Sequence, residues 1–168
     1  MAQAKTLTKQ KLKRLLDVTR GGSRYAERDV TMLLLTHWCG LRVGEVAALR
    51  ITDVVDEQRT VKAEIVLAAA VTKSKRARRI FVPKTMQQQL KRYVSALCQT
   101  SRDSYLFSTQ KNSHFTANKV TQDLQLLCQR AGLVSTKSNS VRRNWLTKFS
   151  AKGVGVLVLA EMAGHASI

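Results

Sequence analysis

The spacing of the apolar residues changes once along this chain, and that change limits the possible folds most. Between Thr60 and Pro83, β-branched residues are concentrated in the stretches TVKAEIVL, AAVT and RRIFVP, which a basic turn interrupts. Short runs of this kind predict a small antiparallel sheet. On either side of this segment the apolar residues recur at helical spacing. The sequence therefore predicts an α+β fold that is mainly α-helical and has one small antiparallel sheet.

Residues that favour helix ends punctuate the helical segments. We expect Thr8 to be the N-cap of a first helix that ends at Gly21 and Gly22, and Gly40 to cap the helix that runs from about Tyr25 to Cys39. Further helices are expected in LRVGEVAALRITDV, KTMQQQLKRYVSAL, TANKVTQDLQLLCQRAG (capped by Thr116 and Gly132), SVRRNWLTKFSAKG and VGVLVLAEMAGH. The length of 168 residues predicts one domain, residues 1–168.

The charge balance points to a polyanionic partner. The chain carries 29 Lys and Arg against 11 Asp and Glu, a net charge of +18. Such an excess repels itself in the folded state, and nucleic acid is the usual partner that offsets it. The alternatives are a membrane-surface protein or a soluble basic protein. The longest apolar stretch, Ile65 to Val71, is too short to span a bilayer and the basic start lacks a signal-peptide pattern, so we expect a cytoplasmic protein without a membrane partner.

The cysteines and the aromatic residues narrow the function further. Cys39, Cys98 and Cys128 are odd in number and far apart, so they predict reduced, buried thiols, with neither a disulfide framework nor a zinc site. Aromatic residues make up only 5% of the chain, which leaves few platforms on which RNA bases could stack. RNA binding is therefore less favoured than DNA binding.

Three polar segments interrupt the apolar pattern. In GLRVGEVAAL, Arg42 follows a helix-ending glycine, and Glu45 lies one helical turn further on. A guanidinium near the edge of a core needs acceptors, and the carboxylate at i+3 can supply them. The alternative is an ordinary surface ion pair.

The second segment, TKSKRARRIFVP, has five cations among the seven residues from Lys73 to Arg79. On a β-turn these side chains would project from the sheet toward DNA phosphates. The candidates for DNA binding here are Lys75, Arg76, Arg78 and Arg79, beside Lys73. The alternative is a solvated charged loop.

The third segment, NSVRRNWLTKF, places Arg142 and Arg143 at an expected helix start. Helix starts attract anions, and an arginine adds forked donors that match a phosphate. Arg143 is a further candidate for DNA binding. Trp145, which follows closely, is expected in the core, because large aromatic residues at helical spacing usually pack there.

The order of these signals resembles the catalytic domain of the tyrosine recombinases, the phage-integrase family. GLRxxE comes first, then a basic hairpin with a lysine, then a helix arginine, then Gly-His at the end, and the resemblance covers essentially the whole chain. The resemblance implies that Arg42 and Arg142 are the two catalytic arginines, that Glu45 supports the first, and that His165 is the catalytic histidine. It implies Lys73 as the hairpin lysine, with Lys75 as the alternative because a turn register is poorly fixed by sequence.

The resemblance also implies a chemistry. Two forked guanidiniums would stabilise the charge that builds on a scissile DNA phosphate, so no metal ion is needed. The lysine would protonate the departing 5′-oxygen, and a tyrosine would become linked to the 3′-phosphate. That linkage stores the energy for rejoining, so no cofactor is expected. The partners implied are double-stranded DNA and, in a full-length protein that is bacterial or phage-encoded, other recombinase subunits.

The sequence departs from the family pattern at two points. Asn139 stands where the family usually has a histidine, and an amide can bind a phosphate oxygen but cannot exchange a proton near neutral pH. The family tyrosine would lie beyond Ile168, whereas Tyr25, Tyr93 and Tyr105 lie in other predicted elements. We therefore expect a fragment that binds DNA without cleaving it.

The remaining expectations concern what surrounds this domain. The family's N-terminal domains would be absent, and the fragment would be monomeric. The alternative function is a non-catalytic DNA-binding module derived from the same fold. For His165 itself, the alternative is a histidine in a terminal tail without a partner.

Overall fold

The computed structural model describes residues 7–97, 100–111, 114–134, 136 and 138–164, without the side chains of residues 138 and 139. The elements in chain order are α1 (Lys9–Gly22), α2 (Ala26–Trp38), α3 (Val43–Ala48), α4 (Ile51–Val54), β1 (Glu64–Leu67), the 3-10 helix η1 (Ala69–Val71), β2 (Arg78–Phe81), α5 (Lys84–Ala96), α6 (Ala117–Arg130), α7 (Ser138–Ala151) and α8 (Val156–Ala163). The predicted class, a mainly α-helical α+β fold with a small antiparallel sheet, is confirmed.

Strands β1 and β2 form the sheet. They are antiparallel, with Ile65 opposite Ile80 and Leu67 opposite Arg78. Alternate residues of β2 are buried, so Arg78 and Ile80 face inward while the side chains between them face solvent. The prediction that AAVT forms a strand is wrong. Ala69–Val71 is the 3-10 helix η1, in which backbone N–H groups bond to carbonyls three residues earlier and no partner strand is needed.

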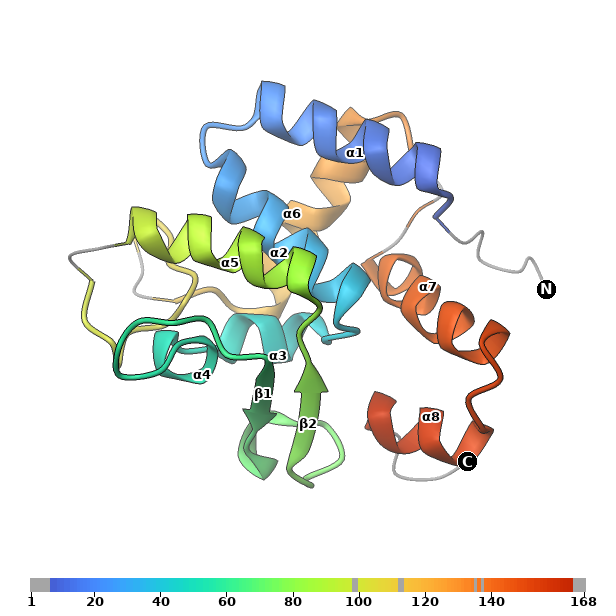
Figure 1. The fold of residues 1–168 in the computed structure, drawn as a ribbon. Helices are drawn as coiled ribbons and strands as arrows, with labels where there is room; N and C mark the ends of the chain where they lie inside the picture. Colours follow the sequence, from blue (N-terminus) through green and yellow to red (C-terminus); the bar gives the residue numbers. More distant parts are fainter. Residues whose placement is uncertain (1–6, 98–99, 112–113, 135, 137, 165–168) are drawn as a thin grey trace.

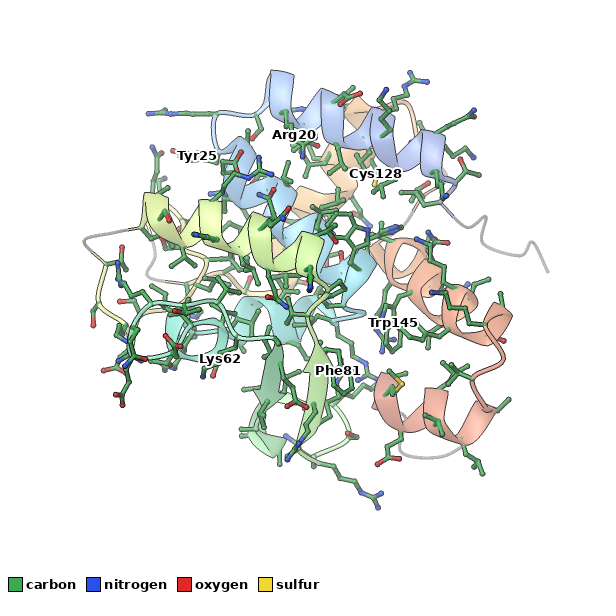
Figure 2. All side chains as sticks on the ribbon, viewed as in Figure 1. Arg20, Tyr25, Lys62, Phe81, Cys128 and Trp145 are labelled. Atoms are coloured by element: carbon green, nitrogen blue, oxygen red, sulfur yellow. The ribbon has the colours of Figure 1, made fainter. Side chains whose placement is uncertain are left out.

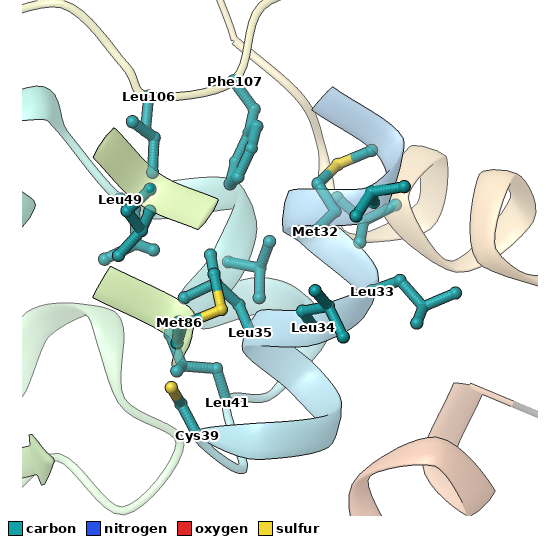
Figure 3. Close-up of a cluster of buried hydrophobic side chains, with 14 of the residues drawn as sticks. Met32, Leu33, Leu34, Leu35, Cys39, Leu41, Leu49, Met86, Leu106 and Phe107 are labelled. Atoms are coloured by element: carbon teal, nitrogen blue, oxygen red, sulfur yellow. The ribbon is translucent and has the colours of Figure 1, made fainter. Parts of the chain in front are cut away.

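Helix α2 forms the centre of the core. It packs against α1, α5, α6 and α7, and its residues from Asp29 to His37 are all buried. Because almost every face of α2 is covered, its apolar residues follow one another rather than forming one stripe. Figure 3 shows this cluster, which includes Met32, Leu33, Leu34, Leu35, Leu41, Leu49, Met86 and Phe107.

Two of the cysteines belong to this interior. Cys39 and Cys128 are buried and unpaired, and burial raises the pKa of the Cys39 thiol to about 12 and that of Cys128 to about 11. Thiols of this kind stay protonated and unreactive near neutral pH. The prediction of buried thiols is confirmed for these two, and Cys98 lies outside the described residues.

The elements divide between two ends of the molecule. Figure 1 shows β1, β2 and α8 at one end, α1 at the opposite end, and α7 along the side between them. Helix α8 contacts both α7 and β2. The three polar segments singled out in the sequence thus meet at the end that holds the sheet. Among the helices that the structure describes, none is both long and apolar enough to cross a bilayer.

A glycine at the corner between α2 and α3 leaves room for a side chain of α7. Gly40 has a φ of 66°, and a Cβ built on it would lie 2.7 Å from Cδ2 of Trp145 in α7. Trp145 is only 6% exposed and lies on the inner side of α7 (Figure 2). The expectations that Gly40 caps the preceding helix and that Trp145 belongs to the interior are both confirmed.

We predict that Gly40→Ala lowers the free energy of unfolding by about 3 kcal/mol, because the left-handed φ and the overlap with the indole are both unfavourable for alanine. Urea denaturation measures this change. The matched control is Gly21→Ala in α1, where a Cβ has nothing within 4 Å and a helical alanine is favoured. Equal stability of the Gly40→Ala variant and the original chain would contradict this explanation.

A buried histidine also joins α2 to α7. His37 is 2% exposed, and its Nε2 lies 3.4 Å from Nδ2 of Asn144. Burial, assisted by the charge of Lys148, lowers the pKa of His37 from 6.5 to about 4. The folded protein therefore keeps this imidazole neutral in a range where the unfolded chain protonates it.

We predict that this contribution to stability is complete above pH 6.5 and disappears as the pH falls toward 4, because the unfolded chain binds the extra proton in that window. The loss amounts to roughly 3 kcal/mol. His37→Gln keeps a hydrogen-bonding side chain that does not titrate, so its unfolding free energy should vary less between pH 6.5 and 4. Parallel curves for the two proteins would contradict the prediction.

Candidate functional site

The first arginine of the site stands at the start of α3. The backbone N–H of Arg42 donates to Oε2 of Glu45 at 2.7 Å, and Nη1 of Arg42 lies 3.4 Å from Oε1 of the same carboxylate. The side chain of Glu45 is 1% exposed and that of Arg42 is 21% exposed. Glu45 is therefore a buried anchor, and it leaves the guanidinium of Arg42 at the surface of the site.

A second arginine shares this carboxylate. Nε of Arg78 donates to Oε1 of Glu45 at 3.1 Å, and its Nη2 donates to Oε2 at 2.5 Å. Arg78 is only 7% exposed. It therefore does not have the exposed, DNA-contacting side chain that the basic run predicted for it. The reason is that side chains alternate between the two faces of a strand. Arg78 is two residues before the inward-facing Ile80, so it faces inward as well.

The third arginine comes from α7. Nε of Arg142 donates to the carbonyl of Gly40 at 2.7 Å. Burial lowers the pKa of Arg142 to about 10, and the nearby charges of Arg42 and Arg78 add to this effect while Glu45 opposes it. The guanidinium remains charged at neutral pH, so cationic groups are held close together here.

The position of Arg142 within its helix differs from the expectation. Helix α7 begins at Ser138, so Arg142 is in its second turn and not among the free N–H groups of a helix start. The Ser-Asn-Ser run, which resembles a loop in composition, forms the first turn. Asn139 is in that turn, but its side chain lies outside the described part of the structure.

The three guanidiniums converge on the C-terminal end of α8. Nη2 of Arg42 donates to the carbonyl of Gly164 at 3.0 Å, Nη2 of Arg142 donates to that of Ala163 at 2.8 Å, and Nη1 of Arg78 donates to that of Met162. The last carbonyls of a helix have no partner within it and carry partial negative charge. Three arginines from three different elements therefore bond three consecutive carbonyls.

The hairpin closes the other side of the site. Thr72 is 2% exposed, and its hydroxyl lies within hydrogen-bonding distance of the carbonyls of Arg76 and Ala69, at 2.7 and 3.1 Å. This contact fixes the start of the basic turn. Lys73 and Lys75 follow it with exposed side chains, and Lys75 has a φ of 55°.

An open pocket of about 900 Å³ connects these elements. Among the described residues, its lining includes six of the candidates: Arg42, Glu45, Lys73, Lys75, Arg142 and Arg143. Arg76 and Arg79 are exposed on the hairpin outside this lining, and the side chain of Arg79 lies 3.7 Å from Glu64. His165 lies outside the described residues. A pocket with five cationic side chains and one carboxylate suits a phosphate group.

The three tyrosines lie elsewhere, since none is among the described residues that line the pocket. The phenol of Tyr93 donates to the carbonyl of Leu106 at 3.0 Å, and burial raises its pKa well above the usual value. The guanidinium of Arg28 stacks over the ring of Tyr25, and that of Arg50 stacks over Tyr105.

Sequence reasoning missed the backbone half of this site. The carbonyl of Gly40 and those at the end of α8 accept hydrogen bonds from the arginines. Every residue has a main-chain carbonyl, so the sequence does not indicate which carbonyls are acceptors in the site. Thr72 was also missed, although a threonine directly before a turn is a signal for a local side-chain to backbone bond.

Comparison with known protein families matches residues 5–168 to the phage integrase family. The chain belongs to the phage integrase family. The resemblance inferred from the sequence motifs is thereby confirmed, and the match includes every element that lines the pocket.

Individual relatives support the family assignment. A tyrosine recombinase from Pseudothermotoga lettingae is 27% identical over 143 residues, which cover 84% of this chain and 47% of the relative. Tyrosine recombinase XerA from Pyrococcus furiosus is 28% identical over 167 residues, which cover 98% of this chain and 54% of the relative. The chain thus spans about half the length of these curated relatives.

Solved structures of family members share the fold. A crystal structure of XerA recombinase aligns with a TM-score of 0.79 and 22% identity, covering 97% of this chain and 57% of that one. The Tn1549 transposon integrase in complex with transposon right end DNA aligns with a TM-score of 0.77 and 18% identity, covering 99% of this chain and 60% of that one. XerH recombinase bound to its palindromic difH substrate aligns with a TM-score of 0.75 and 20% identity, covering 96% of this chain and 46% of that one.

Proposed function

We propose that this chain is the catalytic-type domain of a site-specific DNA recombinase or integrase, which cleaves and rejoins double-stranded DNA through a 3′-phosphotyrosine link. Membership of the phage integrase family supports this function, as do relatives named tyrosine recombinases. Solved structures of XerH and of the Tn1549 integrase with DNA support double-stranded DNA as the substrate. Because the chain spans about half of these proteins, the proposal concerns the activity of a complete protein of which this domain is part.

The convergence of Arg42 and Arg142 is the observation that carries the proposal. These residues are far apart in the sequence, yet both line the same pocket. Their Nη2 atoms bond to the adjacent carbonyls of Gly164 and Ala163. Each guanidinium keeps further N–H groups beyond those in these bonds, so both are able to grip the nonbridging oxygens of one phosphate.

In the proposed reaction, a tyrosine phenol gives up its proton to solvent water and its oxygen attacks the phosphorus, while Arg42 and Arg142 stabilise the charge on the nonbridging oxygens. The bond from phosphorus to the 5′-oxygen breaks, and the ammonium of Lys73 gives its proton to that oxygen. Lys75 also lines the pocket and is the alternative donor. The reverse attack by a free 5′-hydroxyl restores the DNA, so neither a cofactor nor a metal ion takes part.

The other candidates have supporting roles in this proposal. His165 shares a hydrogen bond or a proton with the phosphate, while Asn139 contributes binding alone. Arg143 in the pocket and the exposed Arg76 and Arg79 of the hairpin contact flanking phosphates, which position the duplex without reading its sequence.

We also propose that the attacking tyrosine is not Tyr25, Tyr93 or Tyr105. None of them is among the described residues that line the pocket, and the phenol of Tyr93 is buried and donates to the carbonyl of Leu106, which supports this proposal. The 168-residue chain alone should then bind DNA without cutting it. It should also be monomeric, which sedimentation would check.

We predict that the affinity for duplex DNA falls steeply with salt, and that Arg42→Ala and Arg142→Ala each reduce the slope of log K against log[salt], by at most about 0.9, the value for the one phosphate that both arginines contact. Fluorescence anisotropy over a salt series measures this slope. Arg92→Ala, on the exposed side of α5, is the matched control and should leave the slope unchanged. Unchanged slopes for Arg42→Ala and Arg142→Ala, or tighter binding to single-stranded RNA, would argue against the proposed site.

We predict that the 168-residue chain forms no covalent adduct with a nicked suicide DNA substrate, whereas the complete protein forms one that Arg42→Ala abolishes. Denaturing gels and peptide mass spectrometry would detect the adduct and locate it. An adduct on Tyr25, Tyr93 or Tyr105 would contradict our assignment of the nucleophile. A complete protein that binds DNA tightly without forming any adduct would favour the non-catalytic module instead.

A further inference from the structure

One guanidinium of the arginine cluster makes all its described contacts with the protein itself. Each of the three side-chain nitrogens of Arg78 donates to a protein acceptor: Nε and Nη2 to Glu45, Nη1 to the carbonyl of Met162, and Nη2 also to that of Gly40 at 3.5 Å. The described residues that line the pocket do not include Arg78. Its buried guanidinium therefore has a role other than that of its exposed neighbours in the basic run.

The first effect of Arg78 is on Glu45. Both carboxylate oxygens are shared, because Oε1 accepts from Arg42 and Arg78 side chains, while Oε2 accepts from the Arg42 backbone and from Arg78. The contacts of Arg78, at 3.1 and 2.5 Å, are shorter than the 3.4 Å contact of the Arg42 guanidinium. Arg78 thus supplies most of the neutralisation of Glu45.

Because Arg42 and Arg78 share the Glu45 carboxylate, Arg42 can direct more of its positive charge toward the pocket. A buried carboxylate with one cationic partner would draw that partner close, because a buried charge without compensation is very unfavourable. Without Arg78, Arg42 would be that partner. Its fork would turn toward Glu45, and less of its positive charge would face the pocket.

The second effect of Arg78 is on α8. Its bond to Met162 is one of three that hold the end of this helix, beside those from Arg42 and Arg142. Arg78 lies on β2, at the end of the turn that carries Lys73 and Lys75. It therefore ties the hairpin strand to both the start of α3 and the end of α8.

We propose that Arg78 is a positioning residue of the site: by neutralising Glu45 and holding the end of α8, it keeps the Arg42 guanidinium turned toward the pocket, and it does not itself touch the substrate. This inference rests on the proposed function, since it takes a DNA phosphate as the group that Arg42 binds. It explains why an inward-facing position of β2 carries an arginine in place of an apolar residue.

The test is a double-mutant cycle on DNA affinity. Dissociation constants for duplex DNA are measured for the original chain, Arg78→Met, Arg42→Ala and the double variant, with the exposed Arg92→Met as control. We expect Arg78→Met to weaken binding about tenfold, the size of one lost charge-assisted hydrogen bond. In the Arg42→Ala background the same substitution should change affinity about twofold or less, because sites that act through one contact are not additive.

The conservative variant sharpens the distinction. Arg78→Lys keeps the charge but loses the fork that spans both oxygens of Glu45, so its affinity should lie between those of the original chain and Arg78→Met. A tenfold loss that persists fully in the Arg42→Ala background would mean that Arg78 contacts DNA directly or acts through the general fold. That result would overturn the inference, as would an Arg78→Met variant that binds like Arg92→Met.

Arg78→Met leaves the Glu45 carboxylate with less compensation and is at risk of unfolding. The double variant Glu45→Gln with Arg78→Met removes the buried charge and keeps the side-chain volumes, and thermal melts followed by circular dichroism check that it folds. We expect this folded variant to bind DNA within about threefold of the original chain, since no buried carboxylate then draws the Arg42 fork away from the pocket. A loss of about tenfold in the affinity of this variant would overturn the inference.

The same measurements separate this inference from the proposed function. If Arg42→Ala binds duplex DNA as tightly as the original chain does, the proposed phosphate site is wrong, and the inference about Arg78, which rests on that site, is overturned with it. If Arg42→Ala weakens binding while Arg78→Met does not, the phosphate site stands and only the role of Arg78 is wrong.

Discussion

The buried carboxylate of Glu45 is the interaction on which the rest of the site depends. It is 1% exposed and accepts from the guanidiniums of two arginines, one at the start of α3 and one on β2. A charge in such a place is tolerated when it is paired and fully hydrogen-bonded. Glu45 therefore requires both arginines, and together they fix where the hairpin meets the helical core.

The end of α8 is attached to the same cluster by its backbone. Three guanidiniums bond the carbonyls of Met162, Ala163 and Gly164, so two cations of the pocket, Arg42 and Arg142, and the buried Arg78 also cap a helix. This arrangement uses the negative end of a helix to hold positive groups together. An anion entering the pocket would meet arginines that are already oriented, which lowers the cost of binding.

The sequence was sufficient to predict the fold class, most helices and the convergence of Arg42, Glu45 and Arg142. Their residue types and order are specific, and capping residues such as Thr8 and Gly40 mark helix ends. Other features depend on tertiary structure. The alternation of side chains in RRIFVP is enough to predict that Arg78 faces inward. It does not predict that the carboxylate of Glu45 is its partner. Likewise AAVT has the composition of a strand, and only the absence of a partner strand within the described sheet makes it a turn of 3-10 helix.

The central claim is that the guanidiniums of Arg42 and Arg142 hold one DNA phosphate. A crystal structure of this chain with a short DNA duplex tests it most directly. Our account predicts that nonbridging oxygens of a single phosphate lie within hydrogen-bonding distance of both guanidiniums, with the basic hairpin against the neighbouring backbone. A duplex bound on another face, or Arg42 and Arg142 on separate phosphates, would contradict it.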